Sequence, residues 1–272
     1  NEVTNYGGAI YFYGTYGVTI SNCLFEENIA TIGGGALCLD SYVRTFLVKD
    51  SEFVSNSAGS SAGDGGAIYM NTLNYVTTIQ NTKFSDNTAY FGGAIMVYTT
   101  NEDLTITDVE FLRNGATQVG GALHVGDNLK RFTGTRMLVR YNTALKSGAG
   151  FNFDSYCNYV TITDSNFEYN VAQFHGGGLY FGSNIFYLTI SDVVISYNNA
   201  VIQGGGLYTS HLVSNVILDT VTFSGNNGLF GGGAFLDQLS SNVTMTNLIV
   251  DSNEAKFGAG FYFAMKHDDI TL

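Results

Sequence analysis

Asn170-Val171-Ala172, followed by Gly176-Gly177-Gly178-Leu179-Tyr180, decides the fold, because near copies of these two segments recur along the whole sequence. The recurring asparagines are Asn28, Asn56, Asn87, Asn114, Asn142, Asn170, Asn198, Asn226 and Asn253. Their successive spacings are 28, 31, 27, 28, 28, 28, 28 and 27 residues. A period of this size is typical of a solenoid, a propeller or another repeat array.

One turn of the repeat, residues 160–181, contains three short segments with the character of strands. Residues 160–163 alternate apolar and polar side chains, as expected of a strand with one buried face. After a bend, residues 166–170 form a second strand with Phe167 pointing inward. The third strand follows the glycines at residues 178–181.

Two columns of apolar residues recur at equivalent positions of the turns. The position three residues before each asparagine holds Phe25, Phe53, Phe84, Phe111, Val139, Phe167, Ile195, Phe223 and Val250. The position after the glycines is interpreted as Ile10, Leu37, Ile68, Ile95, Leu123, Phe151, Leu179, Leu207, Phe235 and Phe261. Stacked equivalent residues of this kind indicate an interior shared by all turns.

These features predict an all-β fold, a parallel β-helix solenoid of about ten rungs of about 28 residues with three short strands per rung. Right-handed winding is expected from the handedness of strand crossovers. A propeller blade needs about 40 to 50 residues, which is more than this period supplies. We expect residues 1–272 to be a single β-helix domain and a segment of a longer protein.

Composition narrows the function classes. The sequence is 45% hydrophobic and 12% charged, with 34 Gly and no Pro, which suits short strands joined by tight corners. A net charge of -12 argues against nucleic acid and anionic membrane surfaces as partners. No apolar run reaches the roughly 20 residues that a membrane-spanning helix needs, so we expect no direct membrane insertion of this segment. Cys23, Cys38 and Cys157 are predicted to be free thiols.

The repeated asparagines have a structural interpretation. A stacked asparagine amide can donate to one neighbour and accept from the other, so the column predicts a hydrogen-bonded ladder along the solenoid. The glycine pairs resemble phosphate-binding loops only superficially, because no Lys-Ser/Thr follows them. We therefore assign no catalytic residue, no metal site and no cofactor to the repeat motif.

Paired motifs carry a family resemblance that spans essentially the whole chain. Phe25-x-x-Asn28 precedes Gly34-Gly35-Ala36-Leu37, and the same pairing recurs in later turns. The pairs resemble the repeats of the polymorphic outer-membrane proteins of chlamydiae and of other microbial β-helical surface proteins. The resemblance implies an exported, cell-surface β-helix with adhesive or structural work.

The first functional hypothesis is a non-enzymatic, extracellular structural or adhesive rod that contributes to a filament or surface coat. Self-association or other surface proteins are the expected partners, with carbohydrate as a further candidate. An outward column of tyrosines suits an interaction face, because tyrosine combines an apolar ring with a polar tip. The same column also fits a lateral packing face or a layer covered by the long loops. Its tyrosines are Tyr11, Tyr69, Tyr180, Tyr208 and Tyr262.

A carbohydrate-active enzyme is the alternative, since polysaccharide lyases and glycoside hydrolases also use β-helices. Such an enzyme needs paired carboxylates, or calcium beside a basic residue. The nearest candidates are Asp127, Lys130, Arg131 and Asp154, with residues 267–269 (His-Asp-Asp) at the far end. Solvated loop charges explain both groups more simply.

Two further patterns remain. Thr-x-Thr pairs such as Thr161-x-Thr163 predict a regular outer face, which makes an ice-binding protein a second alternative, although Leu47-x-Lys49 interrupts the pattern. Threonine is also a common exposed strand residue. Asn242-Val243-Thr244 is a sequon, so Asn242 is a glycosylation site if the source is eukaryotic and secretory.

Overall fold

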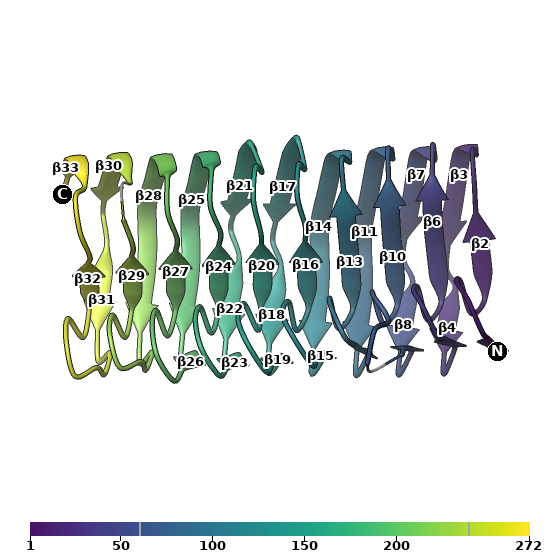
Figure 1. Cartoon of the computed structure of the whole chain (residues 1–272), viewed down its shortest axis with the longest axis horizontal. Coiled ribbons are helices and arrows are strands. Elements are labelled where there is room, and N and C mark those ends of the chain that lie inside the picture. Colours follow the sequence, from purple (N-terminus) through teal and green to yellow (C-terminus); the bar gives the residue numbers. More distant parts are fainter. Residues whose placement is uncertain (60, 239) are drawn as a thin grey trace.

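The computed structural model describes residues 1–59, 61–238 and 240–272, and this part of the chain winds into a parallel β-helix (Figure 1). Successive turns lie side by side along one axis, with the N-terminus at one end and the C-terminus at the other. The predicted all-β parallel solenoid with turns of about 28 residues is therefore confirmed. No helix in the described ranges is long and apolar enough to cross a membrane.

The described strands form three sheets, which we call narrow, middle and wide. The narrow sheet contains β1 (Glu2–Val3), β5 (Ile29–Ala30), β9 (Ser57–Ala58), β12 (Thr88–Ala89), β15 (Gly115–Ala116), β19 (Thr143–Ala144), β23 (Val171–Ala172) and β26 (Asn199–Ala200). The middle sheet contains β2 (Ile10–Phe12), β6 (Leu37–Ser41), β10 (Ile68–Thr72), β13 (Ile95–Thr99), β16 (Leu123–Val125), β20 (Phe151–Phe153), β24 (Leu179–Phe181), β27 (Leu207–Thr209), β29 (Ala234–Leu236) and β32 (Phe261–Phe263).

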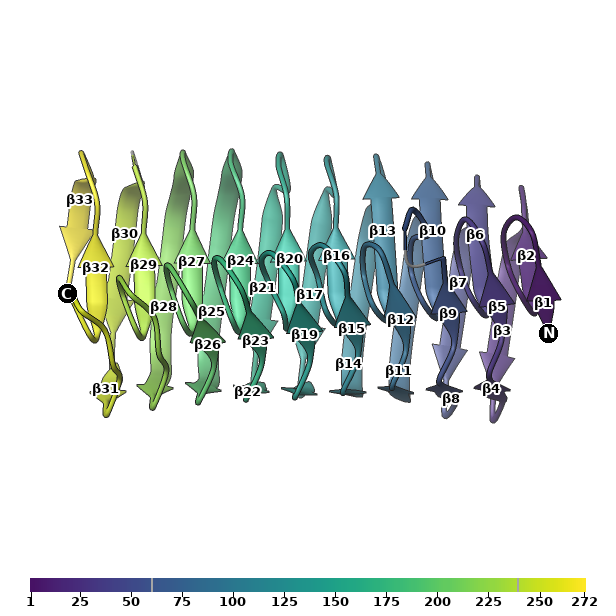
Figure 2. The ribbon, with the colours of Figure 1, turned by 60° about the horizontal axis from the view of Figure 1, so that its bottom comes forward.

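The wide sheet holds the first two predicted strands of each turn, which run together in its longest strands. Its main path contains β3 (Tyr16–Ser21), β7 (Arg44–Lys49), β11 (Tyr75–Ser85), β14 (Glu102–Leu112), β17 (Arg131–Thr135), β21 (Tyr159–Thr163), β25 (Ile185–Ser196), β28 (Val213–Ser224), β30 (Ser241–Thr246) and β33 (Asp268–Thr271). Shorter strands join it beyond the bend at β4 (Leu24–Glu26), β8 (Glu52–Val54), β18 (Leu138–Arg140), β22 (Asn166–Glu168) and β31 (Ile249–Asp251). The two-residue strands of the narrow sheet are an addition to the three predicted strands per turn (Figure 2).

The asparagine column forms a continuous ladder inside the solenoid. The Asn170 amide nitrogen donates to the Val139 carbonyl at 2.9 Å and to Asn198 Oδ1 at 3.0 Å. Its Oδ1 accepts from the backbone and side-chain nitrogens of Asn142 at 3.0 and 2.9 Å. The left-handed backbone conformation lies one residue earlier, as at Tyr169 with φ 55°. The asparagine therefore satisfies backbone groups exposed by the corner that precedes it.

Phenylalanines stack in the interior beside the ladder. The Phe25, Phe53 and Phe84 rings follow one another with centroids 4.8 Å apart, and Phe111 continues the stack at 5.1 Å. Offset stacking of this kind stabilises beyond the area it buries. Equivalent residues of successive turns therefore pack on themselves, as the sequence columns predict.

One assignment in the second apolar column is wrong. Ala234, and not Phe235, pairs with Leu207 and Phe261 on the inward face of the middle sheet. The Phe235 ring lies on the outer face, stacked at 5.5 Å on Tyr208. The interior tolerates the small alanine because Phe261 packs edge-on against Phe223 with ring centroids 5.2 Å apart.

Candidate functional site

The outer face of the middle sheet is largely covered. The segment between the narrow and middle strands of a turn, such as residues 173–178, is called the glycine loop here. Side chains of several described glycine loops pack on this face. The Tyr6 ring stacks on Tyr69 at 5.7 Å, and the His175 ring stacks on Tyr208 at 4.9 Å. These contacts leave only 5% of Tyr69 and 6% of Tyr208 exposed.

Tyr69 and Tyr208 therefore lie under the loops and do not form an open interaction face, which agrees with the alternative of a layer covered by the long loops. Tyr11 is exposed, and Tyr180 and Tyr262 are partly buried. The glycine loops cause this variation in exposure among the tyrosines. The period-two pattern of a strand indicates only which side chains face the interior. It does not report what packs on the other side.

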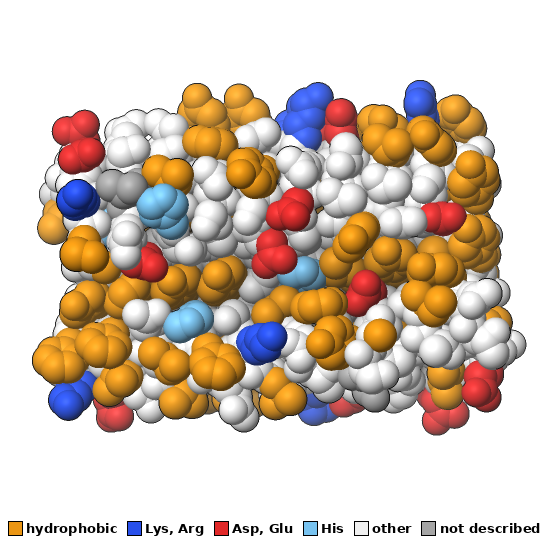
Figure 3. Space-filling model, in the orientation of Figure 1, with side chains coloured by type: hydrophobic (Ala, Val, Ile, Leu, Met, Phe, Trp, Pro, Cys, Tyr) orange, Lys and Arg blue, Asp and Glu red, His pale blue; other side chains and the backbone are white. Residues whose placement is uncertain are grey.

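A cavity of about 310 Å³ lies on the covered face near the middle of the solenoid. Figure 3 shows acidic side chains gathered beside a histidine in this region. The lining comes from several turns and mixes apolar, aromatic and acidic groups. Its residues are Asp64, Phe91, Met96, Tyr98, Thr99, His124, Gly126, Asp127 and Asp154.

His124 in β16 lines the cavity and has a polar neighbour at each ring nitrogen. Its Nδ1 lies 3.0 Å from the amide nitrogen of Asn152, which can only donate, so the ring proton belongs on Nε2. Nε2 in turn lies 3.4 Å from Asp154 Oδ2. Phe91 stacks on the ring at 5.4 Å. Burial lowers the pKa of His124, so the imidazole is neutral near pH 7.

Asp64 reaches the cavity from a glycine loop, where it pairs with Phe91 in a parallel bridge. Its Oδ1 is buried and has no hydrogen-bond partner in the described structure. Burial raises the pKa of Asp64 to about 7. Of the described residues that line the cavity, none is Lys or Arg. The site therefore concentrates acidic groups without a fixed cation to neutralise them.

The structure assembles half of the predicted acidic and basic cluster. Asp127 and Asp154 line the cavity together. Lys130 lies elsewhere, 3.3 Å from Glu102, and Arg131 pairs with Asp103 across the wide sheet. His267, Asp268 and Asp269 lie at the C-terminal end, the two aspartates within β33. In the described ranges, no group of three or more His, Cys, Asp or Glu side chains is placed to hold a metal ion.

A ladder of exposed tyrosines is a feature that the sequence analysis missed. Tyr141, Tyr169 and Tyr197 stack with centroids 5.1 and 5.0 Å apart, and they are 48%, 42% and 53% exposed. Tyr159 and Tyr187 form a second exposed pair at 4.9 Å. The signal was available, because a tyrosine precedes the ladder asparagine in three consecutive turns.

The Thr-x-Thr face lies on the outer side of the wide sheet. Thr105, Thr133 and Thr161 are neighbours in register, and Thr135 Oγ1 lies 3.2 Å from Thr163 Oγ1. Ion pairs border this face on both sides, from Arg131 to Asp103 and from Arg136 to Asp108. The regular array is therefore short and edged by charge.

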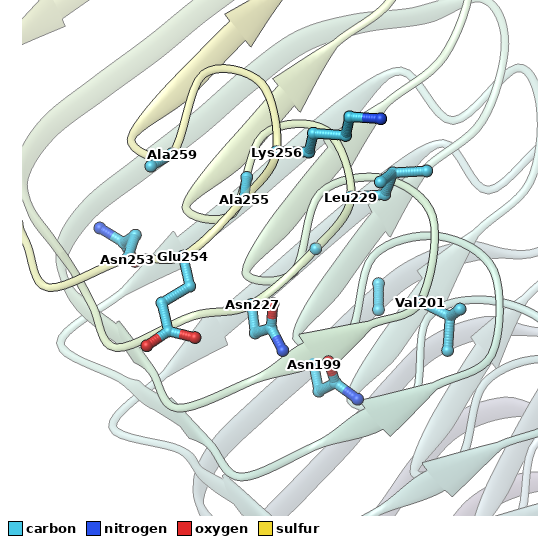
Figure 4. Close-up of a pocket in the computed structure, with 11 residues that line it drawn as sticks. Asn199, Val201, Asn227, Leu229, Asn253, Glu254, Ala255, Lys256 and Ala259 are labelled. Atoms are coloured by element: carbon cyan, nitrogen blue, oxygen red, sulfur yellow. The ribbon is translucent and has the colours of Figure 1, made fainter.

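Two remaining features lie near the C-terminal end. A groove of about 750 Å³ runs over the narrow sheet, and Figure 4 shows Asn199, Asn227 and Glu254 along it from successive turns. The sequon residue Asn242 is exposed, with its amide nitrogen donating to Asn215 Oδ1 at 2.8 Å. Its glycosylation stays a prediction.

Comparison with known proteins agrees with this geometry. A family profile described as right handed beta helix region matches residues 93–272. The chain belongs to the right-handed β-helix family. Within this β-helix, residues 22–40 match the Chlamydia polymorphic membrane protein repeat, which confirms the resemblance seen in the sequence.

Two curated relatives share parts of the β-helix. The probable outer membrane protein pmp20 of Chlamydia pneumoniae is 31% identical over 170 residues, covering 53% of this chain and 10% of that protein. Metabotropic glutamate receptor-like protein R of Dictyostelium discoideum is 32% identical over 133 residues, covering 47% of this chain and 8% of that protein. The match thus spans a tenth or less of either relative. No solved structure matches the chain.

Proposed function

We propose that this β-helix is a non-enzymatic rod at the cell surface or outside the cell, with a structural or adhesive role. The observation that carries the proposal is that the residues of the repeat motif lie in the interior of the solenoid and hold the turns together. Its phenylalanines and asparagines form the interior stack and ladder, so the regular spacing builds a scaffold and leaves the outer tyrosine ladder exposed for contact. The similarity to an outer membrane protein supports the location.

The exposed tyrosine ladder is the proposed contact surface. Tyr141, Tyr169 and Tyr197 present a continuous row of ring edges and hydroxyls, held in place by stacking on one another. Tyrosine is enriched at protein interfaces because its rigid ring buries much area at a small entropic cost. A second copy of the chain or another surface protein is the partner that this row fits, with carbohydrate as the further candidate.

The test is clumping of microspheres coated with the chain, with wild type compared with the triple variant Tyr141→Ser, Tyr169→Ser and Tyr197→Ser. We expect clumping of wild type and a loss of it in the variant. The matched control replaces Tyr42 and Tyr156, which are similarly exposed tyrosines outside the ladder. Equal clumping by the triple variant and the control would remove the ladder from the proposal.

A glycoside hydrolase acting on neutral glycans is the second candidate function. The observation in its favour is that Asp127 and Asp154 line one cavity, as a pair of catalytic carboxylates requires. Acidic polysaccharides fit poorly, because the cavity wall carries acidic groups and no Lys or Arg among its described residues. Release of reducing sugar that disappears in Asp127→Asn and Asp154→Asn, and persists in Asp164→Asn, would favour this enzyme over the rod.

A further inference from the structure

We propose that the cavity around Asp64, Asp127 and Asp154 binds a small organic ammonium ion, such as an alkylamine or a lysine side chain. This site is distinct from the exposed tyrosine ladder, and the inference stands independently of the proposed adhesive role. It rests on the shape of the cavity, the chemistry of its wall and an unsatisfied buried acceptor.

The shape suits a small guest. The cavity holds about 310 Å³, which is at the lower end of the range of about 300 to 1,000 Å³ for ligand pockets. Its lining includes Asp64 and Phe91 from the glycine loops and His124 from the middle sheet. A guest therefore sits between the loop and the sheet and does not lie on an open surface.

The charge of the wall selects a cation. Asp127 and Asp154 face the same space as Asp64, and none of these carboxyls has a Lys or Arg ion-pair partner in the described part of the chain. His124 is the basic residue in the wall, and its burial keeps it neutral. Groups of like charge gathered in a partly enclosed space raise the local concentration of counter-ions. A positive guest is thus favoured over a neutral or negative one.

The apolar part of the wall favours an organic cation over a metal ion. Phe91, Met96 and Tyr98 line the cavity beside the carboxyls. Ring faces attract ammonium groups, and such contacts strengthen when water is excluded. Calcium instead takes six to eight oxygen ligands, a set that these side chains do not supply. The methylene groups of an alkylamine would cover the apolar wall while the nitrogen meets the acids.

Hydrogen bonding points the same way. Asp64 Oδ1 is buried and lacks a partner within the described residues, which is costly for a carboxyl oxygen. A primary ammonium group carries three donors and no acceptor, so it complements a wall rich in acceptors. Asp64 Oδ1 is shielded from the open space, so a guest beside Asp64 satisfies this oxygen only when the carboxyl turns toward the cavity.

The experiment is a ligand-observed NMR titration of the whole chain with n-butylammonium, and in parallel with 1-butanol, a neutral molecule of nearly the same shape. We expect n-butylammonium to bind and 1-butanol to bind at least about tenfold more weakly. A blocked Gly-Lys-Gly peptide is the third probe. Tighter binding of the peptide than of n-butylammonium identifies a protein lysine as the guest, and the reverse identifies a free amine.

Variants then locate the site. At pH 8, where Asp64 is ionised, Asp127→Asn and Asp64→Asn should each weaken n-butylammonium binding by about tenfold, the effect of losing one nearby charge worth about 1.4 kcal/mol. The matched control Asp164→Asn, at an exposed corner of the wide sheet, should bind as wild type does. Binding should also strengthen from pH 6 to pH 8 as Asp64 ionises, and Asp64→Asn should remove that trend.

Other titratable groups near Asp64 could also change n-butylammonium binding between pH 6 and pH 8, so their charge states matter for the pH series. Tyr6 and Tyr69 lie near it with raised pKa values, so they stay neutral over this range. Burial lowers the pKa of His124, which disfavours its protonated form. Equal binding of n-butylammonium and 1-butanol, the absence of n-butylammonium binding, or equal weakening by Asp164→Asn would each overturn the proposal. Thermal unfolding of each variant verifies that a lost signal reflects the site and not the fold.

Discussion

Replacement of a ladder asparagine is the sharpest test of how the solenoid is held together. The Asn170→Ala change removes four hydrogen bonds at distances of 2.9 to 3.0 Å, two donated and two accepted by the side chain. Each such bond contributes about 1 kcal/mol net, so the loss is about 4 kcal/mol. Asn170 is completely buried, so water cannot take over these roles without opening the turn.

Urea denaturation followed by circular dichroism measures the effect. We expect a fall of about 4 kcal/mol in the free energy of unfolding of the cooperative unit that contains the turn. The matched control is Asn166→Ala, a partly exposed asparagine of the same turn outside the ladder, which should cost less than about 1 kcal/mol. A loss at Asn170 no larger than that of the control would refute the ladder as a main source of stability.

Three further predictions follow from the same structure. Gly121→Ala should lower the melting temperature far more than Gly115→Ala, as measured by thermal scans of the two variants. The new methyl group at Gly121 would clash with the Ala149 carbonyl, whereas a methyl group at Gly115 would meet only a side-chain hydroxyl at 3.3 Å. Arg136→Ala should leave the melting temperature almost unchanged, since its ion pair is exposed. The raised pKa of Asp64 means that the folded chain binds the proton more tightly than the unfolded chain does. The free energy of unfolding should therefore fall as the pH rises from about 4 to about 7. Denaturation series across this range should show a smaller fall for Asp64→Asn than for wild type.

Much of the fold followed from the period of the sequence. Each column of equivalent residues meets one environment in every turn, so a single turn such as residues 160–181 predicts the others. The error at Phe235 arose where apolar character was preferred over the spacing from the glycines. Counting from Gly206 and Gly233 places Leu207 and Ala234 at equivalent positions. A small inward residue was acceptable there because Phe261 fills the space beside Phe223.

The candidate cavity could be anticipated only in part. Asp127 and Asp154 follow equivalent strands one turn apart, so their proximity was visible in the repeat. Asp64 is further away in the sequence, and it reaches the same space because the glycine loops fold back over the middle sheet. Hydrophobic periodicity carries no information about that fold-back. For the same reason, the sequence left open whether the column of Tyr69 and Tyr208 is an exposed face or a layer under the loops, and the structure shows that these two tyrosines are buried.

The most direct test of the central claim is antibody labelling of intact cells of the source organism, before and after permeabilisation. The antibodies should be raised against the folded β-helix, so that they recognise its outer faces. A surface-exposed rod predicts strong labelling of intact cells with little increase after permeabilisation. Labelling that appears only after permeabilisation would contradict a surface location and with it the proposed structural or adhesive role.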